Sequence, residues 1–291
     1  SANGLQCLSL AMRDPVGAKA TNCSPTPEPS DIYAAVSGAF SELVAEGAAG
    51  EGDKAKWCRQ FSAFVKKYVS KDGVVPRGWS KKTTMCVPYS ATLYTIQEDL
   101  SDKYHSIVRD LDLPEGQRPF PDKDTYAALV EMAKLMRLAV GRVVVRAFEV
   151  MDWLQKVSRV ANENSVHLEW TTVMGFPVRQ NYLKALEKEF RYKTLGGKTA
   201  KVKVLEDNLK EIHKRRSVNG IVPNFTHSCD GAAMQLSAVY CNDSGADSLS
   251  MIHDSFATHA GDAEILSASL RLAYRDVFSQ DVFGAFEANV R

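Results

Sequence analysis

The sequence has no apolar segment long enough to cross a membrane. A membrane-spanning helix needs about 20 predominantly apolar residues. The longest candidate, Leu135 to Phe148, is interrupted by Arg137, Arg142 and Arg146. The first residues also lack the basic-then-apolar pattern of a secretory signal. We therefore predict no association with a membrane.

Cysteine is scarce and scattered. The 291 residues include six cysteines, none in a CxxC pair and none spaced with histidine as zinc ligands are. This usage argues against a disulfide scaffold and against a structural zinc site, and we expect the cysteines to be reduced thiols.

Net charge of either sign is nearly absent, but the charge is unevenly distributed. The formal net charge is +1, yet Lys54 to Lys82 holds nine basic residues and one acidic one, and Arg179 to Arg216 holds twelve basic and five acidic ones. Two separate basic stretches on an acidic remainder predict a phosphate-bearing partner. The alternative is two solvated surfaces without a ligand.

Hydrophobic spacing predicts a mainly helical chain up to about residue 162. We expect a helix over residues 32–44, capped by Ser30 or Asp31. A basic amphipathic helix should follow through Trp57 to Tyr68. Further helices are expected over 77–99, kinked at Pro88, and over 125–161, the latter capped by Asp124 and the longest of the chain.

Short β-type segments follow at 165–172 and 176–182, and a hairpin with a Gly196-Gly197 turn is expected over 189–205. A helix over 224–240, an apolar segment at 249–256 and a final amphipathic helix complete the chain. A basic two-stranded ribbon fits the major groove of DNA, although a surface hairpin can also be basic without a ligand. The ribbon carries the candidate DNA-binding residues Arg191, Lys193, Lys198, Lys201 and Lys203.

Two clusters have the residue types of a nucleotide site. Arg77 and Lys81 share one helix face, where two cations repel each other unless an anion such as a triphosphate lies between them. Tyr89, two turns further along, is placed to contact a sugar or base. In the second cluster, His253 and Asp254 interrupt an apolar segment, and a carboxylate there suits a divalent metal. The simpler alternative for Asp254 is an ordinary turn residue.

Five blocks in the same order resemble the single-subunit DNA-dependent RNA polymerases of bacteriophages and organelles. They are Ser1–Gln6 with Arg13–Ala18, Arg77-x3-Lys81-Lys82-x6-Tyr89, Gly175-Phe-Pro-Val178, Gly220 to Gly231, and Ile252 to Phe256 with Thr258-His259-Ala260. The resemblance implies an α+β, mainly helical right-hand polymerase fold. Palm would comprise 1–16 and 228–291, and fingers 17–227, with the hairpin region at 179–219.

The resemblance also implies residue roles in template-directed RNA synthesis by two-metal-ion nucleotidyl transfer. Asp254 would hold Mg²⁺, one of two ions in the complete enzyme, and Lys81 would bind the triphosphate and protonate the leaving group. Arg77 and Lys82 would be further phosphate contacts, His253 a substrate contact, and Tyr89 with His227 the pair that senses the 2′-hydroxyl. The implied partners are promoter and template DNA, nascent RNA and nucleoside triphosphates, with a monomeric complete enzyme in the cytoplasm of a phage-infected cell or, alternatively, in a mitochondrion or plastid.

Some positions depart from the family pattern. The first catalytic aspartate is expected just before Ser1, so we expect this chain alone to be inactive as a fragment of a larger enzyme. Cys7 stands where histidine is common, Pro88 is unusual, and Ser90 replaces a glycine. Two alternatives remain open: a fragment of a family-A-like DNA polymerase, which would typically have Glu where Ser255 stands, and a non-catalytic nucleic-acid-binding relative.

Overall fold

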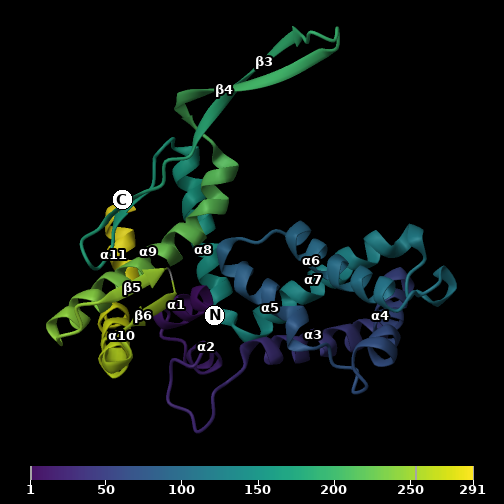
Figure 1. The fold of residues 1–291 in the computed structure, drawn as a ribbon, viewed down its shortest axis with the longest axis horizontal. Coiled ribbons are helices and arrows are strands. Elements are labelled where there is room, and N and C mark those ends of the chain that lie inside the picture. The colour runs from purple at the N-terminus through teal and green to yellow at the C-terminus, as the bar shows by residue number, and fades with distance from the viewer. Residues whose placement is uncertain (1, 253, 291) are drawn as a thin grey trace.

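The structure, a computed structural model, describes residues 2–252 and 254–290, so the predicted substrate contact His253 lies outside the described residues. The helices, shown in Figure 1, are α1 (Asn3–Ala11), α2 (Pro15–Ala20), α3 (Ile32–Ala48), α4 (Gly52–Phe64), α5 (Arg77–Cys86), α6 (Leu93–Asp110), α7 (Asp122–Val143), α8 (Val145–Glu163), α9 (Lys214–Asp243), α10 (Ala263–Ser279) and α11 (Val282–Val290). The strands are β1 (Glu169–Thr171), β2 (Pro177–Arg179), β3 (Leu183–Lys193), β4 (Thr199–Ile212), β5 (Leu249–Ile252) and β6 (Ser255–Thr258). Strand β1 pairs with β2, β3 with β4, and β5 with β6, and each pair is a two-stranded antiparallel sheet. The predicted α+β, mainly helical class is thus confirmed.

The first half of the chain is a helical body built around α3 and α7. Helix α3 begins where the Asp31 carboxylate accepts hydrogen bonds from the backbone N–H groups of Tyr33 and Ala34 at 2.9 and 3.1 Å, so Asp31 is the predicted cap. Helix α3 contacts α4, α5 and α7, and α6 also packs on α7. The predicted apolar face of α7 is completely buried at Leu129, Met132 and Met136.

The predicted helix over 77–99 is wrong, because the chain is interrupted rather than kinked. Helix α5 ends at Cys86, and Val87–Tyr89 form a single 3₁₀ turn. Pro88 has no N–H to donate to the helical ladder, and Ser90 adopts a left-handed conformation with φ of 61°. Helix α6 then begins afresh, with the Thr92 hydroxyl accepting from the N–H of Thr95.

The predicted long helix over 125–161 is also wrong. It is divided at Val144, whose backbone leaves the helical region with φ of −132° and ψ of 67°. The division matches the packing, because α7 lies against α3 and α6 whereas α8 lies against α9. The first part begins at Asp122 after Pro121, so Asp124 stands in its first turn and is not its cap.

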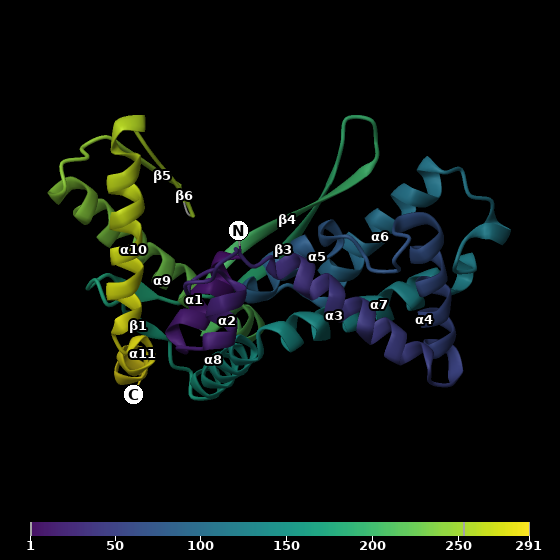
Figure 2. The same ribbon diagram turned by 90° about the horizontal axis from the view of Figure 1, so that it is seen from below.

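The longest helix of the described chain is α9, with 30 residues. It begins ten residues before the predicted start at Asn224 and includes Pro223. The β3–β4 ribbon, also longer than predicted, leads directly into it and projects far from the body in both views (Figures 1 and 2). The ribbon base is joined to α9 because the N–H of His213 donates to the carbonyl of Tyr182 at 2.8 Å.

The C-terminal part packs on the other end of α9. Helix α10 lies along α9, and in α11 the rings of Phe283 and Phe286 each have their centroids 5.4 Å from that of Phe225 on α9. The β5–β6 hairpin covers a small separate core containing Cys241 and Leu266. None of the described helices has the length and apolar character needed to traverse a lipid bilayer.

Candidate nucleotide site and nucleic-acid interface

Two aromatic rings from distant parts of the chain stack on one another. The ring centroids of Tyr89, at the end of the 3₁₀ turn, and His227, in the middle of α9, are 4.9 Å apart with an interplanar angle of 23°. Helix α1 makes the approach possible at Gly4, where an added Cβ would lie 2.7 Å from Pro88 Cγ and 3.1 Å from Tyr89 Cζ. A side chain at position 4 would therefore clash with Pro88 and press on the adjacent Tyr89 ring.

The Tyr89 hydroxyl is held in its protonated form. Burial raises the pKa of Tyr89 above its ordinary value, and the negative charges of Asp230 and Asp254 add to the increase. A protonated phenol can both donate and accept a hydrogen bond. The stacked pair thus presents groups suited to recognising a hydroxyl.

The three predicted phosphate contacts on α5 have different surroundings. Lys81 is exposed and, within the described residues, its side chain has no ion pair or hydrogen bond. Lys82 turns toward α6, where its Nζ lies 3.7 Å from Asp99 Oδ1. Asp99 also pairs with Lys103 of the same helix. Of these two lysines, only Lys81 is positioned to meet an anion without first losing a partner.

Arg77 is already engaged at the start of α5. Its Nε lies 2.7 Å from Asp31 Oδ2, and its guanidinium lies 5.1 Å from the centroid of the Tyr33 ring. These three side chains line a cavity of about 490 Å³ that is also bordered by Ala2 and Gln6. Arg77 therefore lines this cavity with its guanidinium already paired to a carboxylate.

Asp254 lies in the turn of the β5–β6 hairpin and is exposed. Its charge contributes, after burial, to raising the pKa values of Tyr33, Tyr89 and Tyr274, so the carboxylate acts on the same region as the stack and the Arg77 cavity. Among the described residues, no group of three or more metal-binding side chains occurs. One exposed carboxylate nevertheless fits Mg²⁺, which is commonly bound by one or two carboxylates together with substrate phosphates.

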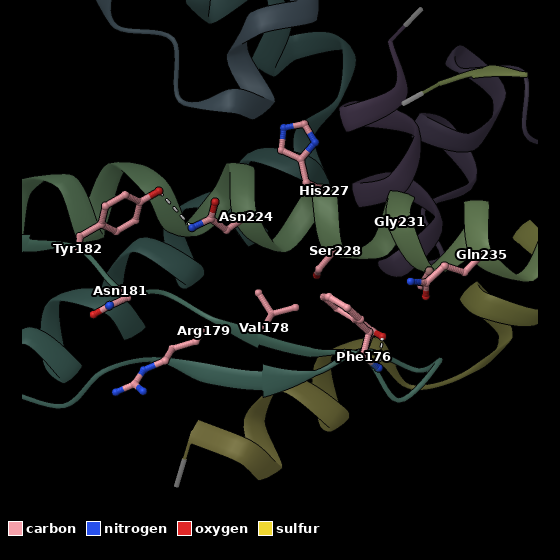
Figure 3. A pocket seen from close by; sticks show the side chains of 12 residues that line it. Phe176, Val178, Arg179, Asn181, Tyr182, Asn224, His227, Ser228, Gly231 and Gln235 are labelled. Carbon is pink, nitrogen blue, oxygen red and sulfur yellow. Dashed lines mark hydrogen bonds between the residues drawn. The ribbon is translucent and has the colours of Figure 1, made fainter. Parts of the chain in front are cut away.

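A second cavity, of about 510 Å³, runs between α9 and the β1–β2 hairpin (Figure 3). Phe176, Val178 and Tyr182 line it from the strand side, and His227 and Ser228 from α9. Asn224 Nδ2 donates to the Tyr182 hydroxyl at 3.2 Å. In Figure 3 the His227 ring projects from α9 away from Phe176 and Val178, so His227 borders both this cavity and the stack.

The basic ribbon neutralises part of its own charge. Glu189 Oε1 lies 2.9 Å from Arg191 Nε and 3.3 Å from Lys201 Nζ, and Glu187 Oε2 lies 2.7 Å from Lys203 Nζ. The register places these five side chains on one face. Lys193 and Lys198, at the tip, have no ion pair within the part of the chain that is described.

The opposite face of the ribbon is apolar and exposed. Phe190 stands opposite Val202, and Tyr192 opposite Ala200. Phe190 and Tyr192 are 54% and 51% exposed, respectively. Arg191, Lys193, Lys201 and Lys203 therefore occupy one face of the ribbon, whereas the second face is mainly apolar and carries Lys188 opposite Val204.

Sequence reasoning missed three contributors to this region: Asp31 as the partner of Arg77, Gly4 as the contact of Tyr89, and the buried Asp230 one turn after His227. Only Asp31 had been singled out, as a helix cap. The other two depend on the packing of α1 against α9 and against the end of α5, which leaves no local pattern in the sequence.

Comparison with known proteins places this geometry in context. A family model described as DNA-dependent RNA polymerase matches residues 1–291. The chain is 29% identical to the DNA-directed RNA polymerase of Enterobacteria phage T3, over 93% of the chain and 33% of that protein. It is 26% identical to DNA-directed RNA polymerase 1, mitochondrial, of Nicotiana sylvestris, over 97% of the chain and 26% of the relative.

A third relative, DNA-directed RNA polymerase 2A of Nicotiana tabacum, is 27% identical over 97% of the chain and 78% of its own length. The chain spans about a quarter to a third of the length of the other two relatives. With the family model matched from the first residue to the last, the chain belongs to the DNA-dependent RNA polymerase family.

Proposed function

We propose that this chain forms the nucleotide-binding part of an enzyme that synthesises RNA on a DNA template. The observation that carries the proposal is the Tyr89–His227 stack, with Lys81, which has no ion pair among the described residues, two turns earlier on the same helical segment. A pair of rings with hydrogen-bonding groups, preceded by a cation without an ion pair among the described residues, suits a nucleoside triphosphate, which combines a ribose with a polyanion.

The stack supplies the proposed selectivity for ribose. A site built to hydrogen-bond a substrate hydroxyl strongly rejects an analogue that lacks it, because the polar groups of the site are left unpaired. The Tyr89 hydroxyl and the His227 imidazole are the groups that would contact the 2′-hydroxyl. Stacking fixes both rings before substrate arrives, which reduces the ordering cost of binding.

Lys81 and Arg77 are the proposed triphosphate contacts. Lys81 donates to the phosphates and delivers a proton to the pyrophosphate as it leaves. Arg77 contributes a planar guanidinium at the cavity it shares with Asp31 and Tyr33. Lys82, paired with Asp99, acts on the same phosphates only through its more distant charge.

Asp254 is the proposed Mg²⁺ ligand of this chain. In two-metal nucleotidyl transfer, bound Mg²⁺ stabilises the attacking and leaving oxygens of an in-line displacement. The role of Asp254 is to supply a carboxylate at the β5–β6 turn, where its charge adds to the raised pKa values of Tyr33 and Tyr89.

The remaining proposals concern organisation and partners. Palm comprises 1–16 and 228–291, and fingers 17–227, with the ribbon region 179–219 contacting promoter DNA through Arg191, Lys193, Lys198, Lys201 and Lys203. Template DNA and nascent RNA are the other partners. The relatives include phage and organellar proteins, in line with both locations expected from the sequence.

Primer extension tests the proposal. This chain replaces the matching segment of the phage T3 relative, and extension of an RNA primer on a DNA template is measured with Mg²⁺ and either ribo- or deoxyribonucleotides. We expect a ribonucleotide preference and, for Asp254→Ala, a loss of rate of about a thousand-fold. A preference for deoxynucleotides would indicate a DNA polymerase. Undiminished synthesis by Asp254→Ala would indicate that this chain has a non-catalytic role.

A further inference from the structure

A chain of buried and partly buried polar groups joins helices α1, α9 and α10 close in sequence to the residues that contact or form the Tyr89–His227 stack. Asn3 Nδ2 on α1 donates to Asp230 Oδ1 on α9 at 2.7 Å, and the Tyr274 hydroxyl on α10 donates to Asn3 Oδ1 at 3.1 Å. Cys7 Sγ lies 3.7 Å from the same oxygen. Asn3 and Asp230 are 4% and 5% exposed. One asparagine therefore joins three helices.

Because these polar groups are buried, losing any one of their hydrogen bonds is energetically costly. A carboxylate removed from water is costly unless hydrogen bonds compensate it, and removing one partner of a buried polar pair leaves the other unsatisfied. Asn3 is suited to the junction because its amide offers a donor to Asp230 and an acceptor to Tyr274 at the same time. The network therefore has one well-defined geometry.

Both rings of the stack are attached to this network through short structural links. Asp230 follows His227 by three residues on α9, so the two side chains leave neighbouring positions of one helix surface. Gly4 follows Asn3 on α1 and contacts Pro88 and Tyr89. Since α1 contacts Tyr89 and α9 carries His227, the hydrogen bond between Asn3 and Asp230 helps to set the separation of the two rings.

Asp230 also affects the stack through its charge. Burial raises the pKa of Tyr89, and the charge of Asp230 raises it further, so the phenol stays protonated to a higher pH than an exposed tyrosine. The effect on the pKa of Tyr274 is of the same kind, with burial again the largest cause. Asp230 therefore contributes both to the position and to the raised pKa of the ring that would contact the sugar.

We propose that Asp230, Asn3 and Tyr274 are positioning residues that fix the Tyr89–His227 stack and thereby set its discrimination between ribose and deoxyribose. The discrimination rests on the proposed function, whereas the positioning of the stack does not. Hydrogen bonding to one hydroxyl depends on placement to within a fraction of an ångström. When the stack is loosened, the site should therefore lose its selectivity for ribose before it loses affinity for the triphosphate.

The first experiment observes the stack without any nucleotide. In the 291-residue chain, the His227 imidazole proton signals are identified by their absence in His227→Gln, and the ring-current shift caused by Tyr89 is defined with Tyr89→Leu. We expect Asp230→Ala and Tyr274→Phe to move the His227 signals toward their Tyr89→Leu positions. Asp230→Asn, which keeps an acceptor for Asn3, should retain most of the wild-type shift. Asp243→Ala, an exposed aspartate at the end of the same helix, is the matched control.

The second experiment measures the ratio of dissociation constants for dATP and ATP by equilibrium titration. We expect Asp230→Ala to lower this ratio about ten-fold and Tyr274→Phe, which removes only a hydroxyl and should fold normally, about three-fold. In a Tyr89→Phe background the same changes should have no further effect on the ratio, because the network acts through Tyr89.

The outcomes separate the two proposals. If the wild-type chain binds ATP and dATP equally, the proposed function fails and the discrimination role fails with it. If the wild type discriminates but Asp230→Ala and Tyr274→Phe leave the ratio unchanged, only the present inference is overturned. It is also overturned if the His227 signals stay in place in both variants, or if the ratio falls equally in the Tyr89→Phe background.

Discussion

The two basic stretches of this chain look equivalent in the sequence and differ in the structure. On α5, Lys81 is exposed without an ion pair among the described residues and precedes Tyr89 of the stacked pair by eight residues. On the ribbon, Glu187 and Glu189 occupy the same face as Arg191, Lys201 and Lys203 and pair with them. A count of charges along the chain measures neither availability nor surroundings, and those two properties decide which cation can bind a phosphate.

The largest expected effect concerns Lys81. Lys81→Ala should weaken ATP binding to the 291-residue chain by about 10- to 100-fold, because a charge-assisted hydrogen bond contributes about 1.5–3 kcal/mol. Titration with ATP, inorganic triphosphate and adenosine measures it. The loss should appear for the two phosphate-bearing ligands and not for adenosine. Lys71→Ala, an exposed lysine of the same basic stretch, is the control, and an equal loss there would mean that total charge and not position is responsible.

The ribbon provides the next effect. Replacing both Glu187 and Glu189 by glutamine should release Arg191, Lys201 and Lys203 to bind phosphates. The slope of log K against log salt should become steeper by about 0.9 for each further phosphate of duplex DNA that the ribbon neutralises. Fluorescence anisotropy of a labelled duplex at several salt concentrations measures this slope. Glu163→Gln, an exposed glutamate outside the ribbon, serves as the control. An unchanged slope would show that the paired cations already bind DNA or never do.

A smaller effect is expected at Arg77. Asp31→Asn keeps the cap of α3, because asparagine caps as well as aspartate, but removes the charge that pairs with Arg77. Exposed ion pairs contribute about 0–1 kcal/mol, so triphosphate binding should tighten by at most about five-fold. Binding of inorganic triphosphate at neutral pH is the measurement. Weaker binding would show that Asp31 helps to position Arg77 and does not compete for it.

The smallest effect is expected on the apolar face of the ribbon. Phe190→Ser should change the free energy of unfolding by no more than about 0.5 kcal/mol, because the ring is largely exposed. Phe225→Ala, at a ring that is 1% exposed, should cost about 3–5 kcal/mol. Urea denaturation compares the two. A large loss for Phe190→Ser would reveal that the ribbon face is covered in the folded protein.

Local chemistry allowed much of the fold to be predicted. The Asp31 cap, the buried face of α7 and the Gly196-Gly197 turn all follow from short-range patterns, and the structure has each of them. Asp254, for which a turn residue was the simpler alternative, lies in the turn between β5 and β6. The errors occurred where packing decides. The chain breaks at Val144 within a periodic apolar pattern, because α7 packs on α3 and α6 whereas α8 packs on α9.

The candidate site was less accessible to sequence reasoning. Nothing in the spacing of Tyr89 or His227 indicates that they touch, and their pairing came from the family resemblance alone. The chain is interrupted between Cys86 and Leu93, where only a kink at Pro88 was expected. By contrast, the pairing within the ribbon was readable in principle, since Glu187, Glu189 and Arg191 alternate along one strand and so share a face.

The length of α9 has a mechanical consequence. Its 30 residues make a rod of about 45 Å, joined at one end to the ribbon and carrying the imidazole of His227 nearer its middle. Tyr182, at the ribbon base, is fastened to this rod through His213 and Asn224. Pro223 removes one hydrogen bond from the helical ladder about one turn before His227, which weakens the helix at that point. A force that DNA exerts on the ribbon would therefore be transmitted along α9 and would tilt the imidazole of His227.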